Sequence, residues 1–209
     1  MLTKAWAVDT GAMRITRILC AAAAIGLSSG CTVSHYVDGS TKEVSTAQYR
    51  KPAQPRPVQL VFVFQKLGVA SEPETLHWKA QVADQVKAAG LFSEVSDVPV
   101  TSGAVLDVTL NHVSLTDNVF SKGFVSGLAL GLHGNSASDG YICTVRYQRD
   151  NAATPVVKLA RHAIYATVNA SDAPLNAVKA ENVDAAVSTM TRQILSNALG
   201  DLSNDPDFK

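Results

Sequence analysis

The residues most able to do chemistry in this chain are three cysteines, five histidines and the serines that lie near glycines. A serine nucleophile elbow requires Gly-x-Ser-x-Gly, and neither Ser126 nor Ser136 has both glycines. No phosphate-binding loop is present, because Gly123 follows Lys122 instead of preceding it. The histidines show no His-Glu-x-x-His or similar ligand spacing; they are His35, His77, His112, His133 and His162. The sequence therefore predicts no catalytic residue, no metal site and no soluble cofactor.

Catalysis by residues that are distant in sequence stays open as an alternative. Asp107, His112 and Asp139 would supply a base and two carboxylates if the fold brought them together. Their spacing along the chain does not indicate that it does. We expect His112 and His162, which fall on predicted strands, to be structural histidines.

One cysteine has neighbours that predict a chemical modification. Arg14 and Arg17 precede an uncharged apolar stretch, Ile18–Leu27, which is too short to span a bilayer. Small residues follow directly, in the run Ser28-Ser29-Gly30-Cys31. This arrangement is typical of a secretory signal that is removed, here residues 1–30. Met13 would open a compact signal and is the expected start, although Met1 remains an alternative.

The run Ser28-Ser29-Gly30-Cys31 resembles the lipobox of bacterial prolipoproteins, although its aliphatic residue, Leu27, lies four positions before the cysteine where the family usually has three. The resemblance implies cleavage before Cys31, a covalent lipid on its thiol and further acylation, with palmitate as a typical chain. Several acyl chains give a stable membrane anchor. Thr32, which is not an aspartate, implies the outer membrane and a periplasm-facing domain, with the inner membrane less expected. An ordinary cysteine after a plain secretory cleavage is the alternative.

The charge of the mature chain limits the kinds of partner that we expect, and its cysteine content limits the possible disulfides. Loss of residues 1–30 removes three basic side chains and one acidic one, which leaves 15 basic against 17 acidic groups. This balance argues against a nucleic-acid partner. Cys143 is then the one cysteine without an assigned role, in an alternating apolar pattern, so we expect it to be buried. A reactive thiol or an intermolecular disulfide is the alternative.

The chain divides into segments by composition. Residues 31–57 are rich in Ser, Thr, Gln and Pro and predict a lipidated, flexible tether, which could reach on the order of 85 Å. Residues 58–200 predict one globular domain, and 201–209 a polar tail. Within the domain, apolar alternation predicts strands near 58–65, 91–95, 105–113, 141–148 and 156–168, and the third has Leu106, Val108 and Leu110 on one face. Helical spacing predicts a helix from Ser71 to Ala89, which Ser71 and Glu74 would open as a capping box and which would bury Trp78, Val82, Val86 and Ala89. A second helix is predicted from about 183 to Gly200.

This order of elements predicts an α+β fold. We expect a single sheet of four to five strands, mostly antiparallel, covered by two helices, with a glycine-rich apolar insertion between the central strands. Residues 88–95 and 106–110 loosely resemble a run found in outer-membrane lipoproteins that assist secretion or cell-wall synthesis. That likeness implies a fold more than a role.

The insertion, residues 119–132, is far more apolar than a surface loop. As a helix, it would place glycines and large apolar residues on two adjacent stripes, which permits close helix packing. The residues that we expect to make contacts are Phe120, Gly123, Phe124, Gly127, Leu128, Gly131 and Leu132. The segment would cover the sheet internally, dock on a protein partner or a second copy of the chain, or lie on a membrane.

The sequence therefore predicts a non-enzymatic interaction or assembly module of the cell envelope, anchored to the membrane through Cys31. Its expected partner is another envelope protein, and a homo-oligomer is an alternative. A membrane-active module that uses residues 119–132 and an envelope enzyme without a recognisable motif are the rival hypotheses.

Overall fold

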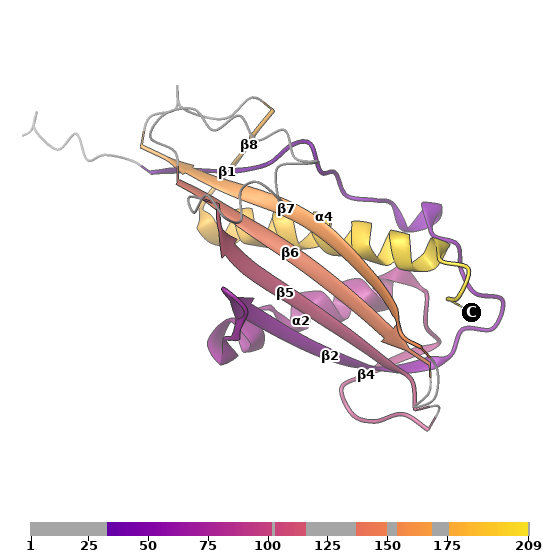
Figure 1. Cartoon of the computed structure of the whole chain (residues 1–209). Helices are drawn as coiled ribbons and strands as arrows, with labels where there is room; N and C mark the ends of the chain where they lie inside the picture. Colours follow the sequence, from indigo (N-terminus) through magenta and orange to yellow (C-terminus); the bar gives the residue numbers. More distant parts are fainter. Residues whose placement is uncertain (1–32, 102, 116–136, 150–153, 169–175, 209) are drawn as a thin grey trace, which may run out of the picture. The chain divides into compact units, whose positions relative to one another are not determined.

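Four long strands of alternating burial form the centre of a sheet in the computed structural model (Figure 1). They are β2 (Pro57–Lys66), β5 (Val105–Ser114), β6 (Ala137–Gln148) and β7 (Val156–Thr167). In β5 the predicted face is confirmed, because Leu106, Val108 and Leu110 are buried. The structure describes residues 33–101, 103–115, 137–149, 154–168 and 176–208, all within one unit, Val33–Lys209.

Four short strands extend this sheet. They are β1 (Ser34–Val37), β3 (Val69–Ala70), β4 (Glu94–Ser96) and β8 (Val178–Ala180). The strand order is β3-β2-β5-β6-β7-β1-β8, with β4 also paired to β2. β2 runs parallel to β4 and β5, and the other pairs are antiparallel. The fold is α+β, but the prediction of four to five strands is wrong: the sheet has eight, because β1, β3 and β8, of two to four residues, are too short to show a period of two.

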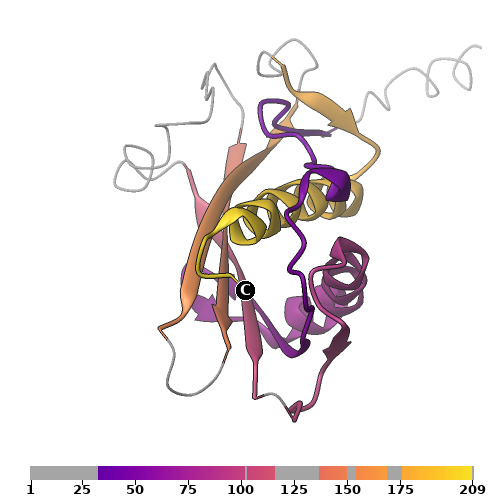
Figure 2. The ribbon, with the colours of Figure 1, turned by 90° about the vertical axis from the view of Figure 1, so that its right-hand side faces the viewer.

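Two α-helices of the described chain lie on the same side of the sheet (Figure 2). α2 (Glu72–Ala89) begins after Ser71 and ends at Gly90, which takes a left-handed conformation with φ of 64°. Its buried residues are those predicted from helical spacing, namely Trp78, Val82, Val86 and Ala89. α4 (Val183–Asn204) continues one turn past Gly200, because Leu202 is fully buried in the core.

The segment predicted as a tether is packed on the domain wherever the structure describes it. β1 pairs with β7 and β8, and a 3-10 helix, η1 (Thr46–Gln48), leads to the buried Tyr49. The Tyr49 hydroxyl donates to the Ser196 carbonyl of α4 at 2.8 Å. The flexible region predicted for 31–57 therefore does not extend beyond Ser34, and the folded domain begins there.

The predicted polar tail, 201–209, also belongs to the domain. α4 occupies residues 201–204, and Phe208 is buried. Its ring packs edge-on against Tyr147, with centroids 5.1 Å apart, and against Phe92 at 5.9 Å. Burial of the Phe208 ring attaches the tail to the domain, although the neighbouring residues are polar.

Several strands and both α-helices begin or end at the same end of the sheet, which we call the Val33 end. β1 starts there, since Ser34 pairs with Thr167 at the end of β7. β2 ends there beside β3, and α2 begins there because Ser71 donates its N–H to the Phe64 carbonyl at 2.8 Å. α4 begins there as well, after β8, whose Ala180 pairs with His35. Among the described residues, no helix is both long and apolar enough to cross a bilayer.

Candidate functional site

A pocket opens at the Val33 end, on the side of the sheet that carries the helices. Its volume is about 520 Å³. The first turns of α2 and α4 form one side, and the ends of the long strands form the other. Buried apolar side chains make the floor, among them Phe64, Trp78 and Tyr141. Ionisable side chains surround it; they are Lys66, Glu74, His77, His112, Asp139 and Asp184.

A histidine–aspartate pair lies in this pocket. The His112 Nε2 atom is 2.8 Å from Asp139 Oδ1, across the β5–β6 pair. The His112 ring also stacks on Tyr141, with centroids 5.1 Å apart and planes inclined by 25°. A carboxylate in this position fixes the orientation and tautomer of the imidazole. The pair could therefore hold or accept a proton from a molecule in the pocket.

Asp107 does not join this pair. It lies on the opposite face of β5, where its carboxylate accepts a hydrogen bond from Arg146 Nη1 at 3.0 Å. The described lining of the pocket contains no serine, threonine or cysteine that could serve as a nucleophile beside His112. Within the described ranges, no three His, Cys, Asp or Glu side chains are grouped as metal ligands.

The rim of the pocket is fixed by the start of α2. Ser71 and Lys66 both donate hydrogen bonds to the Glu74 carboxylate. These two bonds lower the pKa of Glu74 to about 2. The Thr75 hydroxyl accepts the Phe64 N–H at 2.9 Å, which ties α2 to β2. The capping box predicted from Ser71 and Glu74 is not formed, because the two side chains bond to each other and Ser71 makes no side-chain bond to the helix backbone.

Burial makes the other reactive groups near the core inert. Cys143 is buried, as predicted, and desolvation raises the pKa of its thiol to about 12. Burial and the nearby Asp139 raise the pKa of Tyr141 above its usual range. These groups stay neutral at physiological pH, and a neutral buried thiol is a poor nucleophile.

His162 is buried between β7 and α4. Its Nε2 atom is 2.7 Å from Gln193 Oε1, and the Ala163 N–H donates to Nδ1 at 2.8 Å. Burial lowers the pKa of His162, so the ring is neutral. Nearby, the buried Asp38 accepts a hydrogen bond from the Tyr165 hydroxyl at 2.8 Å. His162 has the satisfied contacts of a structural histidine, and it does not line the pocket.

Most residues that the sequence nominates for function lie outside the described chain. These are the lipidation residue Cys31 and the contact residues Phe120, Gly123, Phe124, Gly127, Leu128, Gly131 and Leu132. The residues on either side of the 116–136 segment are described, and they show at which end of the sheet the segment is attached. β5 ends and β6 begins at the Val33 end, since Ser114 and Asp139 are paired. The described residues on either side of the segment therefore lie beside the pocket.

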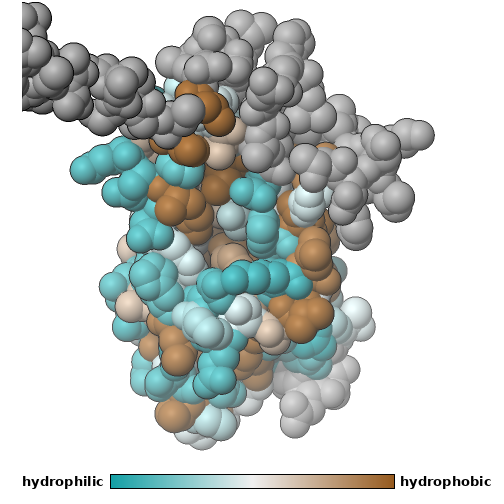
Figure 3. Space-filling view, turned by 90° about the vertical axis from the view of Figure 1, so that its left-hand side faces the viewer, coloured by the Kyte–Doolittle hydropathy of each residue, from teal (hydrophilic) through white to brown (hydrophobic). Residues whose placement is uncertain are grey.

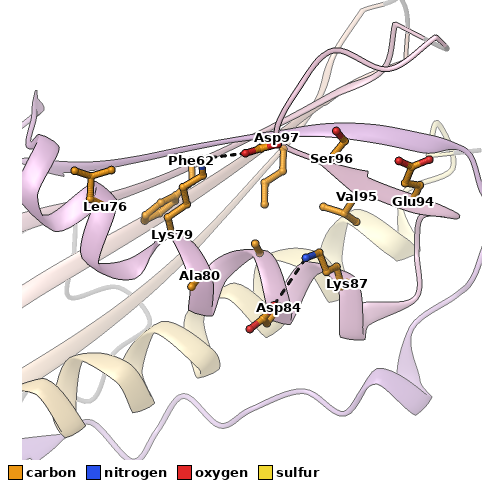
Figure 4. Close-up of a pocket in the computed structure, with 12 residues that line it drawn as sticks. Phe62, Leu76, Lys79, Ala80, Asp84, Lys87, Glu94, Val95, Ser96 and Asp97 are labelled. Carbon is orange, nitrogen blue, oxygen red and sulfur yellow. Dashed lines mark ion pairs between the residues drawn. The ribbon is translucent and has the colours of Figure 1, made fainter.

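A second hollow of about 640 Å³ separates α2 from β4 and the edge of β2 (Figure 4). The Lys79 ammonium, on α2, lies 3.6 Å from the Asp97 carboxylate, just after β4. Both side chains are at least half exposed, and such pairs contribute little to stability. The lysines of this groove are paired with carboxylates, Lys79 with Asp97 and Lys87 with Asp84, and none of the described histidines lines it. The pocket with His112 and Asp139 is therefore the stronger candidate.

Comparison with known proteins defines no family for this chain. No family model matches it, and no curated protein does. Several solved structures are weakly similar, and two of them illustrate how weak the similarity is. A PelC dodecamer from Paraburkholderia phytofirmans matches at 15% identity over 81% of this chain and 96% of that one, with a TM-score of 0.33. The crystal structure of an uncharacterized protein matches at 12% identity over 74% of this chain and 92% of that one, with a TM-score of 0.30.

Proposed function

We propose that this protein is an envelope lipoprotein, anchored through lipid on Cys31, whose domain acts as a non-enzymatic interaction module close to the membrane. The proposal rests on one observation. The first strand residue after Cys31, the pocket with His112, and both flanks of the apolar segment 119–132 all lie at the Val33 end. A single end would thus combine the anchor with the surfaces available for binding.

The expected partner is an envelope protein or a second copy of this chain, bound through residues 119–132. An apolar segment whose described flanks lie beside an open pocket is suited to docking, because apolar side chains and a pocket both offer surface that a partner can cover. The acidic balance of the mature chain favours a protein partner over a nucleic acid.

A membrane-active module is the second candidate, and the position of the same segment favours it. Lipid on Cys31 would bring the Val33 end, and with it residues 119–132, to the bilayer. Fourteen residues that include Lys122 are too few to span a bilayer, so the segment would lie on the surface.

Metabolic labelling with radioactive palmitate tests the anchor. The full chain should take up label and sediment with membranes, and Cys31→Ser should lose both properties. Cys20→Ser is the matched control, because Cys20 would leave with the signal peptide, and it should keep both. Label that persists in Cys31→Ser would overturn the proposed anchor.

A photo-crosslinking residue at Phe124 tests the module. Capture of an envelope protein or of a second copy would support the interaction module. Capture of lipid would favour the membrane-active alternative, and cross-links confined to the same chain would contradict both.

A further inference from the structure

We infer that the Val33 end is itself a phospholipid-contact surface, so that the domain stands end-on on the bilayer with its long strands directed away from it. This inference rests on the proposed lipid anchor, and it concerns the described residues of the domain. It assigns an orientation and a second membrane contact in addition to the acyl chains.

Chain length is the first argument. Ser34 follows Cys31 by three residues, which gives at most about 10 Å of extended chain. Ser34 is not free to move away, because β1 pairs with β7 and β8 on both of its sides. An anchor on Cys31 therefore holds this end of the sheet at the level of the lipid headgroups. The long tether predicted from composition would have left the orientation open.

The distribution of exposed apolar side chains is the second argument. Among the described residues, eleven large hydrophobic side chains are exposed. Five of them lie at the Val33 end, on the first residue of the domain, the β2–β3 turn, the end of β7 and the first residue of α4. They are Val33, Leu67, Val69, Val168 and Val183. Separate segments of the chain thus bring apolar groups to one end (Figure 3).

The β2–β3 turn presents its apolar groups in a fixed geometry. Leu67 has a left-handed backbone with φ of 52°, which is uncommon for a residue other than glycine. Its N–H donates to the His112 carbonyl at 2.8 Å, and the Gly68 N–H donates to Asn111 Oδ1 at 2.9 Å. Leu67 and Val69 nevertheless remain 63% and 70% exposed. The turn holds two apolar side chains outward that no described residue covers.

The charges at this end point to an apolar contact and against an attraction to anionic headgroups. Two lysines stand among five acidic side chains; the basic residues are Lys66 and Lys179, and the acidic ones are Glu72, Glu74, Asp139, Glu181 and Asp184. Lys66 is already paired with Glu74. The part of this surface that the structure describes lacks the basic cluster that recognises acidic lipids. A bilayer rich in uncharged or zwitterionic headgroups is therefore the fitting partner.

Once the chain is anchored, a weak affinity of the Val33 end for the bilayer surface is enough to orient the domain. The anchor makes contact with the bilayer intramolecular, and a short linker gives a high effective concentration. Apolar side chains that would not bind membranes by themselves then select one orientation. The opposite end, with Val98 and Val157, is kept away from lipid by the length of the strands, ten residues or about 33 Å for β5.

Site-specific photo-crosslinking in the full chain, in cells that carry radiolabelled phospholipid, tests this orientation. The cross-linking residue replaces Leu67 or Val69 at the Val33 end, and Val98 or Val157 at the other end. Val98 is 60% exposed and Val157 45% exposed, so both are matched controls. We expect phospholipid adducts at Leu67 and Val69, and only background at Val98 and Val157.

Two results would overturn the inference. One is background labelling at Leu67 and Val69, or equal labelling at all four positions. If the chain still carries palmitate on Cys31, either outcome would leave the lipid anchor in place and refute the contact between the Val33 end and phospholipid. The other is capture of a protein, and no lipid, at Leu67 and Val69. Phospholipid adducts at these two positions without palmitate on Cys31 would support the contact while refuting the anchor.

Discussion

Replacement of Tyr49 by alanine should strongly destabilise the domain, because the ring and hydroxyl of this residue bind residues 38–56 to α4. The Tyr49 ring is buried and lies on Gly200, where an added Cβ would come within 3.3 Å of Tyr49 Cε1. Removal of a large buried aromatic side chain costs about 3–5 kcal/mol. The loss of the 2.8 Å hydrogen bond to the Ser196 carbonyl is one part of the cost, about 1 kcal/mol.

Urea denaturation followed by circular dichroism measures this effect. Tyr49→Ala should lower the free energy of unfolding by about 3–5 kcal/mol, and Tyr49→Phe, which keeps the ring, by about 1 kcal/mol. Gln48→Ala is the matched control at an exposed neighbour and should change it by less than about 0.5 kcal/mol. If Tyr49→Ala were as stable as the Gln48 control, the segment would be the loose tether that its composition predicts, and the present account of it would be refuted.

Three further predictions concern His162, Gly39 and Cys143. Burial lowers the pKa of His162, so the unfolded chain takes up a proton at a higher pH than the folded one, and stability should fall as the pH drops below the ordinary value of 6.5. His162→Gln should flatten this slope in denaturation series between pH 7 and 5, and an unchanged slope would point to another group. Gly39→Ala should lower the melting temperature, at a cost of about 1–3 kcal/mol, because its Cβ would lie 2.0 Å from the Asn176 carbonyl oxygen; an unaltered melting temperature would contradict that close approach. Cys143 should resist alkylation in the native protein and react in urea, and rapid native labelling would show that its thiol is accessible.

The long elements could be predicted because each carries its own periodic pattern. In α2, Trp78, Val82 and Val86 recur at helical spacing, and in β5 Leu106, Val108 and Leu110 alternate. Both patterns reflect burial on one face, which the structure reproduces. The α+β class follows from the order of these elements.

The strands β1 and β8 could not be predicted in this way, because they are short and β1 pairs with distant residues of the chain. β1 has four residues and follows a signal-like segment, and it becomes a strand through β7, whose Thr167 is paired with Ser34. Tyr49 lies in a stretch rich in polar residues and proline, and only its contacts with Ser196 and Gly200 of α4 make it part of the core.

The candidate pocket depends on the register between β5 and β6. His112 meets Asp139 because Ser114 and Asp139 are paired in that register. Sequence spacing does not determine this pairing, since the residues between the strands do not fix how far one strand slides along the other. The sequence nominated both residues, together with Asp107, without being able to separate the true pair from the residue on the opposite face.

The central claim, a lipid anchor three residues before the first strand, is tested most directly by mass spectrometry of the amino-terminal peptide of the mature protein from membranes. The account predicts a peptide that begins at Cys31 and carries a diacylglyceryl group on the thiol and an acyl group on the amine. A peptide that begins elsewhere, or an unmodified Cys31, would contradict it.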